Sequence, residues 1–343
     1  MVPGQGIADM HMSLYSVRMP ERLDAALDAL KAIAEATRLR IVALLQHGEL
    51  TVTDRTEILG QSQPRVSRHL RLLVDAGLVD KHREGAWVFF RLVEAGSRRE
   101  LVHAAIATVH ADDPVLAADL ARLDSVRARR AAAASQYFEQ IAPIWDEERS
   151  LHAAADTVEA AIVGVIGDQP LGRVLDVGTG TGRMLQLLAD RANRSVGLDS
   201  SHSMLSVARA NLERAGVVNW ELRQGDVHSP PLDAASFDLV VIHQVLHYLE
   251  DPARAISEAA RLVAPGGRLL VVDFAPHRHD FLRGAAHRRL GFAHQQLADW
   301  FDHSGFDCPT IIDVGPPAGQ DGLTVTVWLA TNRTLPAAQR EVA

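Results

Sequence analysis

The stretch RVLDVGTGTG, residues 173–182, decides the fold of the larger part of this 343-residue chain. Its first half is a short apolar run with β-branched residues, the pattern of a buried strand. Its second half is a glycine-rich turn that leads into a helix predicted over 184–192. Such a turn at the carboxyl end of a strand lets a ligand approach the backbone, and the start of the following helix favours negative charge. The sequence therefore predicts a ligand-binding edge on an open α/β sheet.

Helical and extended patterns alternate from about residue 156 onward, which predicts a mostly parallel sheet covered by helices on both faces. Further strands are expected at SVGLD (195–199), ELRQGDV (221–227), FDLVVIH (237–243), RLLVVDF (268–274), CPTIIDVG (308–315) and LTVTVWLAT (323–331). We therefore expect one α/β domain over residues 156–332, followed by a C-terminal tail at 333–343.

The spacing of the glycines in this loop decides between two possible classes of ligand. A dinucleotide fingerprint, G-x-G-x-x-G counted from Gly178, requires a glycine at position 183, where Arg183 stands. The run Asp-Val-Gly-Thr-Gly-Thr-Gly at 176–182 resembles instead the first motif of class I S-adenosylmethionine (SAM)-dependent methyltransferases, and the resemblance extends over residues 135–330. It implies a Rossmann-like seven-stranded sheet with a terminal antiparallel pair, SAM as the cofactor and S-adenosyl-L-homocysteine as the product.

Acidic residues at three predicted strand ends strengthen this resemblance. It implies that Asp176 orients the loop and meets the methionine amino group, that Asp199 accepts from the ribose hydroxyls, and that Asp226 accepts from the adenine amino group. Any one of these acids could serve merely as a helix cap or a turn residue. The three together, at this spacing, indicate a cofactor site. The cofactor-binding residues expected from the resemblance are Tyr137, Asp176, Gly178, Gly180, Gly182, Asp199, Ser200, Met204, Asp226, Val227 and His243.

The reaction implied by the resemblance needs little chemistry from the protein. Methyl transfer from a sulfonium is an in-line displacement, and a base is required only where the acceptor loses a proton. The sequence leaves the catalytic residue unknown. The candidates after the fourth and fifth strands are His247, Asp273 and His277, and structural or cofactor-contacting roles for the histidines stay open.

Several acceptor classes are disfavoured. A single cysteine, Cys308, is too few for arsenite methylation and does not occupy the position used for cytosine C5 chemistry, and no [DN]-P-P-[YFW] motif follows the fourth strand. The run HQVLHY at 243–248 resembles the corresponding loop of small-molecule methyltransferases. The His- and Arg-rich stretch 276–292 hints at an anionic or polar acceptor, although an ordinary surface helix explains it equally well. We expect a small-molecule methyl acceptor.

The first part of the chain has the pattern of a helical domain. Apolar residues recur at helical spacing over 23–34 and again over 37–48. Thr51 or Thr53 is placed to cap a short third helix, which Gly60 ends.

Residues 62–79, SQPRVSRHLRLLVDAGLV, have the marks of a recognition helix, with Ser62 as N-cap and Pro64 in the first turn. After Gly77 the runs LVDKHR and AWVFFRL predict a short hairpin, or wing. Arg and Gln side chains bond base edges and phosphates, so the outward polar side chains are candidates for contact with DNA, although a solvated helix face explains them equally well. The DNA-binding candidates are Gln63, Arg65, Ser67, Arg68, His69, Arg71, Lys81 and Arg83.

Residues 27–92 resemble the ArsR/SmtB family of bacterial winged-helix repressors on the runs ATRLRI, VSRHL, AGLV and REGAWVFFRL. The resemblance implies a winged helix-turn-helix, mainly α with a β-hairpin wing, that binds palindromic double-stranded operator DNA as a homodimer. The family's metal-binding cysteines are missing from residues 51–60. His103 and His110 lie without the family's spacing, and a surface or dimer-interface role suits them better. We predict no metal site.

Residues 113–135 have helical propensity and contain no glycine, so they predict a helical linker or an extension of a dimer interface. The aromatic-rich segment 135–148 either completes a small core or, as in class I methyltransferases, forms a lid helix in which Tyr137 closes over the cofactor. The expected organisation is an N-terminal tail at 1–19, a winged-helix domain at 20–112, a linker and lid helix at 113–155, and the α/β domain.

Composition and charge limit the partners and the cell compartment expected for this chain. The net charge of −8 argues against non-specific nucleic-acid binding by the whole surface, but basic residues outnumber acidic ones within 63–91. One cysteine excludes an intrachain disulfide, no apolar stretch is long enough to cross a membrane, and the N-terminus lacks a secretory pattern. These features predict a cytoplasmic protein that does not bind membranes.

Three functions fit this sequence. The first is a DNA-binding transcriptional regulator with a SAM-binding methyltransferase domain that methylates a small molecule. The second is a non-catalytic repressor that senses SAM or S-adenosylhomocysteine. The third is a dimeric small-molecule methyltransferase whose winged helix is only structural. Intact cofactor motifs favour binding, and binding alone does not establish turnover.

Overall fold

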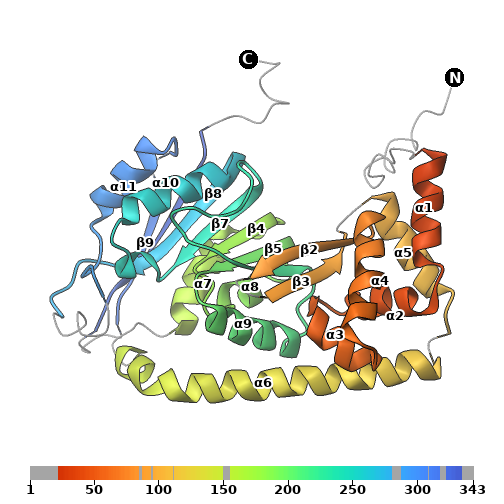
Figure 1. Ribbon diagram of the computed structural model, residues 1–343. Coiled ribbons are helices and arrows are strands. Elements are labelled where there is room, and N and C mark those ends of the chain that lie inside the picture. The colour runs from red at the N-terminus through yellow and green to blue at the C-terminus, as the bar shows by residue number, and fades with distance from the viewer. Residues whose placement is uncertain are drawn as a thin grey trace, which may run out of the picture. The chain divides into compact units, whose positions relative to one another are not determined.

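A computed structural model of the chain describes residues 22–84, 87–93, 96–110, 112–149, 155–279, 287–307, 309–316 and 322–333. The chain divides into two compact units, Met1–Val126 and Arg127–Ala343. Each unit has its own sheet and its own hydrophobic core. The two units are therefore described separately (Figure 1).

The first unit is a winged helix-turn-helix, as predicted. Its helices are α1 (Leu23–Ile33), α2 (Ala36–Leu45), α3 (Val52–Leu59), α4 (Gln63–Asp75) and α5 (Ser97–Ala107). Its strands are β1 (Leu50–Thr51), β2 (Val79–Glu84) and β3 (Trp87–Leu92), and they pair antiparallel in the order β1-β3-β2 (Figure 1). Buried apolar side chains from every helix form one core, among them Ile41, Leu44, Ile58 and Leu70.

Local signals place the helix-turn-helix. Thr51, rather than Thr53, caps α3: the Asp54 backbone N–H donates to Thr51 Oγ1 at 3.2 Å, and Asp54 Oδ2 accepts from the Thr51 backbone N–H at 2.7 Å. Gly60 ends the helix in the left-handed region at φ 63°. Ser62 stands at the N-cap of α4, but its side chain makes no capping hydrogen bond there. Thr51 therefore fixes the start of α3, and Gly60 fixes the turn between α3 and α4.

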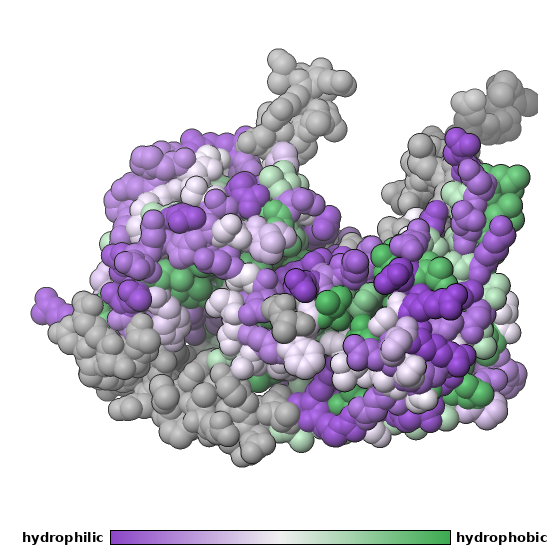
Figure 2. All heavy atoms as spheres, in the orientation of Figure 1, coloured by the Kyte–Doolittle hydropathy of each residue, from purple (hydrophilic) through white to green (hydrophobic). Residues whose placement is uncertain are grey.

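The exposure of α1 differs from what its apolar spacing predicted. Leu23, Leu27 and Leu30 are 77%, 42% and 47% exposed, whereas Ala29 and Ile33 are the residues of α1 in the core. Figure 2 shows hydrophobic surface along α1 in the same orientation. The helix therefore has two apolar faces, and a single chain buries one of them.

A single helix, α6 (Pro114–Arg149), follows the winged helix and crosses the boundary between the units. Leu123 and Val126 of its first half are buried in the core of the first unit. The segments expected as linker (113–135) and lid (135–148) both fall within this helix, apart from residue 113. Tyr137 is at a position whose side chain lies outside the described part of the structure.

The second unit is the predicted α/β domain. Its helices are α7 (Ala155–Ile166), α8 (Arg183–Leu187), α9 (His202–Arg214), the 3-10 helix η1 (Leu246–Tyr248), α10 (Pro252–Leu262) and α11 (His294–His303). Its strands are β4 (Gly172–Val177), β5 (Ala192–Asp199), β6 (Trp220–Gln224), β7 (Phe237–His243), β8 (Val263–Phe274), β9 (Thr310–Val314) and β10 (Val325–Thr331).

The seven strands form one sheet in the order β6-β5-β4-β7-β8-β10-β9. Strands β4 to β8 are parallel, and β10 pairs antiparallel with both β8 and β9, which gives the terminal antiparallel pair. Helices α10 and α11 cover one face of the sheet, and α7 packs on the other. The carboxyl ends of β4, β5, β6 and β7 consequently meet at one edge.

The helix predicted over 184–192 is wrong at its C-terminal end. Helix α8 stops at Leu187, and Ala192 already pairs with Gly172 in the parallel ladder between β4 and β5. Sheet pairing overrides the helical propensity of this segment because the ladder with β4 extends back to Ala192. Among the described residues, no helix is both long and apolar enough to span a bilayer.

Candidate functional site

The glycine loop after β4 has a backbone that only glycine adopts readily. Gly178, Gly180 and Gly182 have φ angles of 73°, 51° and 79°. The backbone N–H groups of Gly178 and Thr179 donate to Leu198 O at 2.7 and 2.9 Å, which fixes the loop against β5. A Cβ at Gly178 would meet a Val245 methyl at 2.4 Å, whereas one at Gly180 would meet nothing closer than 4.0 Å. The loop is therefore packed tightly at Gly178 and open at Gly180, where a ligand has room to approach.

Asp176, the last but one residue of β4, is 1% exposed. Its Oδ2 accepts from Thr179 Oγ1 at 2.7 Å, and its Oδ1 has no hydrogen-bond partner among the described residues. Burial raises the pKa of this carboxyl to about 7, the negative charge of Asp199 adds to the rise, and the Thr179 hydrogen bond opposes it. A buried carboxylate oxygen without a partner fits a cationic group, such as the ammonium of the expected SAM.

Asp199 ends β5 and faces the same loop. Its Oδ2 accepts from the Gly180 backbone N–H at 2.9 Å, and its Oδ1 accepts from the Ser201 backbone N–H at 2.8 Å. Each carboxylate oxygen keeps a second lone pair, so the group remains able to accept from two neighbouring hydroxyls. The Gly225 backbone N–H donates to Asp199 O at 3.0 Å, which joins the end of β6 to this position.

The other expected cofactor residues lie at the same edge. Asp226 is exposed, and its Oδ1 accepts from the His228 backbone N–H at 2.9 Å, which lowers the pKa of the Asp226 carboxyl. Met204 is half-buried in the first turn of α9, Val227 is half-buried against the main core, Ser200 is exposed, and His243 ends β7 half-buried.

A second group of polar side chains follows β7 and β8. His247 Nδ1 lies 2.8 Å from Asp273 Oδ1, and the two side chains are 1% and 0% exposed. The backbone N–H groups of Leu246 and Phe274 donate to Asp273 Oδ2 and Oδ1 at 3.0 and 2.8 Å. The sequence candidates His247 and Asp273 are thus in direct contact.

Two further histidines surround this pair. His277 lies near it, and burial, followed by the neighbouring imidazoles of His279, His287 and His247, lowers the pKa of His277 to about 4. The His287 ring is 4.3 Å from the His247 ring and is stacked on Phe274 at 5.8 Å. The sequence marked the stretch 276–292 but did not single out His287, because only the packing of residues after β8 brings it to η1.

The outer face of α4 carries most of the side chains expected to contact DNA. Gln63, Arg65, Arg68 and Arg71 are exposed, and Ser67 is half-buried. On the wing, Lys81 and Arg83 of β2 are exposed. The described residues thus include five exposed cations on α4 and β2: Arg65, Arg68, Arg71, Lys81 and Arg83.

His69 does not point outward as expected. Its side chain is 13% exposed, and its Nδ1 lies 3.4 Å from Glu35 Oε2 at the N-cap of α2. Burial and the nearby arginines Arg38, Arg65 and Arg68 lower its pKa against the opposing effect of Glu35. His69 therefore joins α4 to α2.

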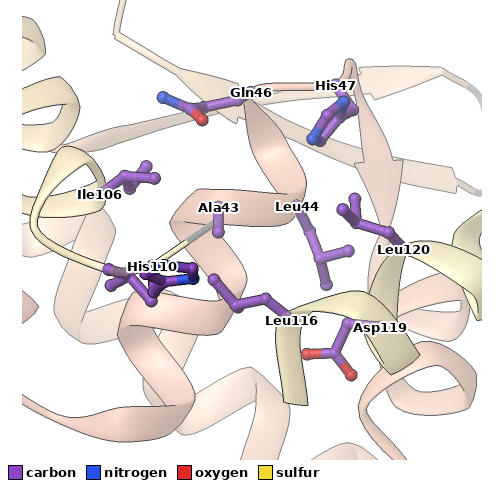
Figure 3. A pocket seen from close by; sticks show the side chains of 10 residues that line it. Ala43, Leu44, Gln46, His47, Ile106, His110, Leu116, Asp119 and Leu120 are labelled. Carbon is purple, nitrogen blue, oxygen red and sulfur yellow. The ribbon is translucent and has the colours of Figure 1, made fainter. Parts of the chain in front are cut away.

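The first unit also contains a pocket between α2, α5 and the start of α6, shown in Figure 3. Its wall includes Asp119, which is 1% exposed and accepts from Arg40 Nε at 2.6 Å and from Arg40 Nη2 at 2.7 Å. The residues that line it are Ala43, Leu44, Gln46, His47, Ile106, Val109, His110, Leu116, Asp119 and Leu120. His103 Nδ1 lies 3.1 Å from Gln46 Nε2, whereas the His110 ring contacts Asp112, so these two histidines have separate partners.

Family models match both units. Residues 35–81 match the model described as bacterial regulatory protein, arsR family, and residues 175–271 match the model of a methyltransferase domain. The chain is 32% identical over 177 residues to an uncharacterized 37.1 kDa protein in transposon Tn4556 of Streptomyces fradiae, covering 47% of this chain and 51% of that protein. It is 34% identical over 151 residues to a probable S-adenosylmethionine-dependent methyltransferase of Mycolicibacterium smegmatis, covering 43% and 56%.

The chain thus spans about half the length of these curated relatives. Among solved structures, the YcgJ protein from Bacillus subtilis aligns with a TM-score of 0.44 and 20% identity, over 52% of this chain and 99% of that one.

Proposed function

Because the chain joins an ArsR-type helix-turn-helix to a SAM-dependent methyltransferase domain, we propose that it is a transcriptional regulator that binds operator DNA and methylates a small molecule. Residues 20–112 form the DNA-binding domain in this proposal, 156–332 the methyltransferase domain, and 113–155 the connection between them. The observation that carries the enzymatic half is the buried Asp176 carboxylate, with a free oxygen beside the open glycine loop.

The residues at the loop fit SAM. Asp176 holds the methionine ammonium, Gly180 leaves room for the cofactor beside the backbone, Gly178 and Gly182 shape the loop, and Asp199 accepts from the ribose hydroxyls. Asp226 and Val227 meet the adenine, Ser200 and Met204 border it, and His243 and Tyr137 complete the cofactor residues. When bound, SAM supplies the activated methyl group and leaves as S-adenosylhomocysteine. The protein contributes orientation and exclusion of water.

The DNA-binding half rests on the exposed cations of α4 and the wing. Gln63, Ser67 and these cations lie on the recognition helix and the wing, and their chemistry suits phosphates and base edges of a duplex. A second copy of the chain covers Leu23, Leu27 and Leu30, since burying each leucine contributes about 1.5–3 kcal/mol. A homodimer presents two recognition helices to a palindrome, in the cytoplasm where bacterial DNA is found.

Two experiments separate this proposal from its alternatives. The first is a gel shift of the full chain on DNA from immediately upstream of its own gene, titrated with SAM and S-adenosylhomocysteine. The second measures transfer of a labelled methyl group to the small-molecule fraction of a bacterial extract. DNA binding together with turnover supports the proposal. Ligand-dependent DNA binding without turnover favours the sensor, and turnover without DNA binding favours a structural winged helix.

SAM binding is expected to weaken as the pH falls below 7. The pKa of Asp176 in the free protein is about 7, and an ammonium beside it favours the ionised form. SAM therefore binds the deprotonated carboxylate, and its affinity falls up to about tenfold per pH unit below 7. Calorimetric titration between pH 5 and 7 measures this, and Asp176→Asn is expected to bind more weakly but without the slope. An equal slope in that variant contradicts the assignment.

The same raised pKa has a consequence for the free protein. Since the folded pKa of Asp176 lies above its ordinary value of 3.8, its contribution to stability is fully present below 3.8 and is lost as the pH rises through 7. The thermal shift caused by SAM is therefore expected to be larger at pH 7 than at pH 5.5.

Arg65→Ala and Arg68→Ala are each expected to weaken DNA binding about tenfold and to lower the salt slope by about one. Both side chains are exposed on α4, where they are placed to contact phosphates. Fluorescence anisotropy on upstream DNA at several salt concentrations checks this. Arg22→Ala, which removes an exposed arginine at the N-cap of α1, serves as the matched control. Equal losses in all three variants would indicate a general charge effect and not a recognition surface.

A further inference from the structure

The pair formed by His247 and Asp273 lies beside the cofactor loop. Val245, two residues before His247, packs against the position of Gly178 in the glycine loop. The ladder between β7 and β8 pairs His243 with Val272, which brings Asp273 next to the start of η1. The pair therefore stands at the carboxyl edge of the sheet, where a molecule that receives the methyl group must lie.

Asp273 fixes how the His247 ring is presented. Because backbone N–H groups donate to both of its oxygens, the carboxylate of Asp273 acts as an acceptor and orients His247 through Nδ1. A neutral imidazole held in this way has its proton on Nδ1 and a lone pair on Nε2. His247 Nε2 is buried and has no hydrogen-bond partner among the described residues. A buried ring nitrogen of this kind costs stability unless a ligand or a water molecule donates a hydrogen bond to it.

Apart from Asp273, the described side chains that pack on the His247 ring are aromatic. The ring centroids of Tyr248, His287 and Phe274 lie 4.0, 4.3 and 4.9 Å from that of His247. His277, with its pKa lowered to about 4, is neutral at physiological pH. Its Nε2 is a second buried nitrogen without a partner among the described residues.

The described arginines of this segment, Arg278, Arg288 and Arg289, are exposed. Arg288 lies 3.9 Å from Glu250 Oε2, and Arg289 donates to Glu250 O at 2.7 Å. The described residues around His247 thus favour a flat, uncharged polar acceptor, which is the second of the two classes, anionic or polar, that the sequence of 276–292 suggested.

We propose that His247, oriented by Asp273, is the general base for an acceptor that bears a phenolic or enolic hydroxyl. The acceptor proton moves to His247 Nε2 while the acceptor oxygen bonds to the methyl carbon; the carbon–sulfur bond breaks, and its electron pair stays on sulfur. The product is a methyl ether. An imidazole base suits a phenolic or enolic hydroxyl far better than an aliphatic alcohol, because the aliphatic hydroxyl is a much weaker acid. This inference rests on the proposed methyltransferase function.

The test identifies the bond that receives the methyl group. The full chain is incubated with methyl-tritiated SAM and the small-molecule fraction of a bacterial extract, and the labelled products are sorted by chemistry. Label that resists alkaline hydrolysis and passes a cation exchanger is expected, because aryl and enol methyl ethers behave in this way. Label released by alkali, as from a methyl ester, or retained as a methylated amine overturns the proposal. Absence of any transfer, with SAM still bound, contradicts the methyltransferase function itself.

Variants test the base with the same labelled pool. His247→Gln is expected to lower kcat about 100-fold or more while the KM for SAM stays within twofold. Asp273→Asn is expected to lower kcat and to shift the dependence of kcat on pH. The titratable side chains near His247 are Asp273, His277, His279, His287 and Tyr248. His294→Gln, which breaks the exposed His294–Asp313 pair of the same unit, is the matched control and keeps full activity. Parallel loss of SAM affinity and thermal stability in His247→Gln assigns the pair a structural role and overturns the proposal.

Discussion

Asp199→Ala is expected to raise the dissociation constant for SAM at least 100-fold. The substitution removes both oxygens that accept from the ribose, and it also frees the Gly180 and Ser201 backbone N–H groups that hold the loop. Each hydrogen bond to a charged acceptor contributes about 1.5–3 kcal/mol, and two of them correspond to a factor of 100 or more. Equilibrium dialysis with labelled SAM measures the effect, and S-adenosylhomocysteine is expected to lose the same factor.

Two variants control this result. Asp190→Ala removes an exposed carboxylate of the same unit and is expected to leave the affinity unchanged. Asp199→Asn keeps one acceptor oxygen and is expected to fall between the wild type and Asp199→Ala. If Asp199→Ala binds SAM as tightly as the wild type, the ribose site is elsewhere.

Asp119→Ala is expected to lower the free energy of opening of the helix-turn-helix by about 3 kcal/mol. The buried carboxylate accepts from Arg40 Nε, Arg40 Nη2 and Arg122 Nη2, at 2.6, 2.7 and 2.5 Å. Through the same guanidinium groups, Arg40 reaches Leu59 O at 3.5 Å and Arg122 reaches Ile58 O at the end of α3. Removing the carboxylate leaves partly buried arginines without their charge partner, which typically costs several kcal/mol.

Hydrogen exchange measured by mass spectrometry on the full chain locates this effect. Amides of α2 and α3 are expected to lose protection in Asp119→Ala, whereas those of the second unit keep it. Asp112→Ala, whose side chain is 92% exposed, is the control and is expected to change protection by less than about 0.5 kcal/mol. A change below 1 kcal/mol in Asp119→Ala would show that the arginines find other partners.

The cofactor edge was predictable because its signals are local. A strand, three glycines with positive φ and an acid at the next strand end follow one another between Gly172 and Asp199, and a parallel sheet brings such strand ends together at one edge. Asp176 and Asp199 could therefore be predicted without knowing how distant residues pack. The same holds for Thr51 and Gly60, whose capping and left-handed roles depend on the three or four residues beside them.

The features that escaped prediction depend on contacts between distant segments. His69 belongs to the helical face that was expected to be exposed. Its contact with Glu35, at the N-terminus of α2, depends on how α2 packs against α4, which the sequence pattern does not give. His287 lies 40 residues after His247, so no spacing rule joins their rings. Helix α8 ends early because strand pairing claims Ala192. Pattern alone also cannot tell which apolar face of α1 the first unit buries.

The exposed leucines of α1 have a consequence for how the target gene responds to the amount of protein in the cell. If two copies must associate through Leu23, Leu27 and Leu30 before the operator is recognised, the occupied fraction of operator rises with the square of the monomer concentration while dimers are scarce. Dilution by growth would then release the promoter more abruptly than it would for a monomer. A small change in expression of this chain would have an amplified effect on transcription.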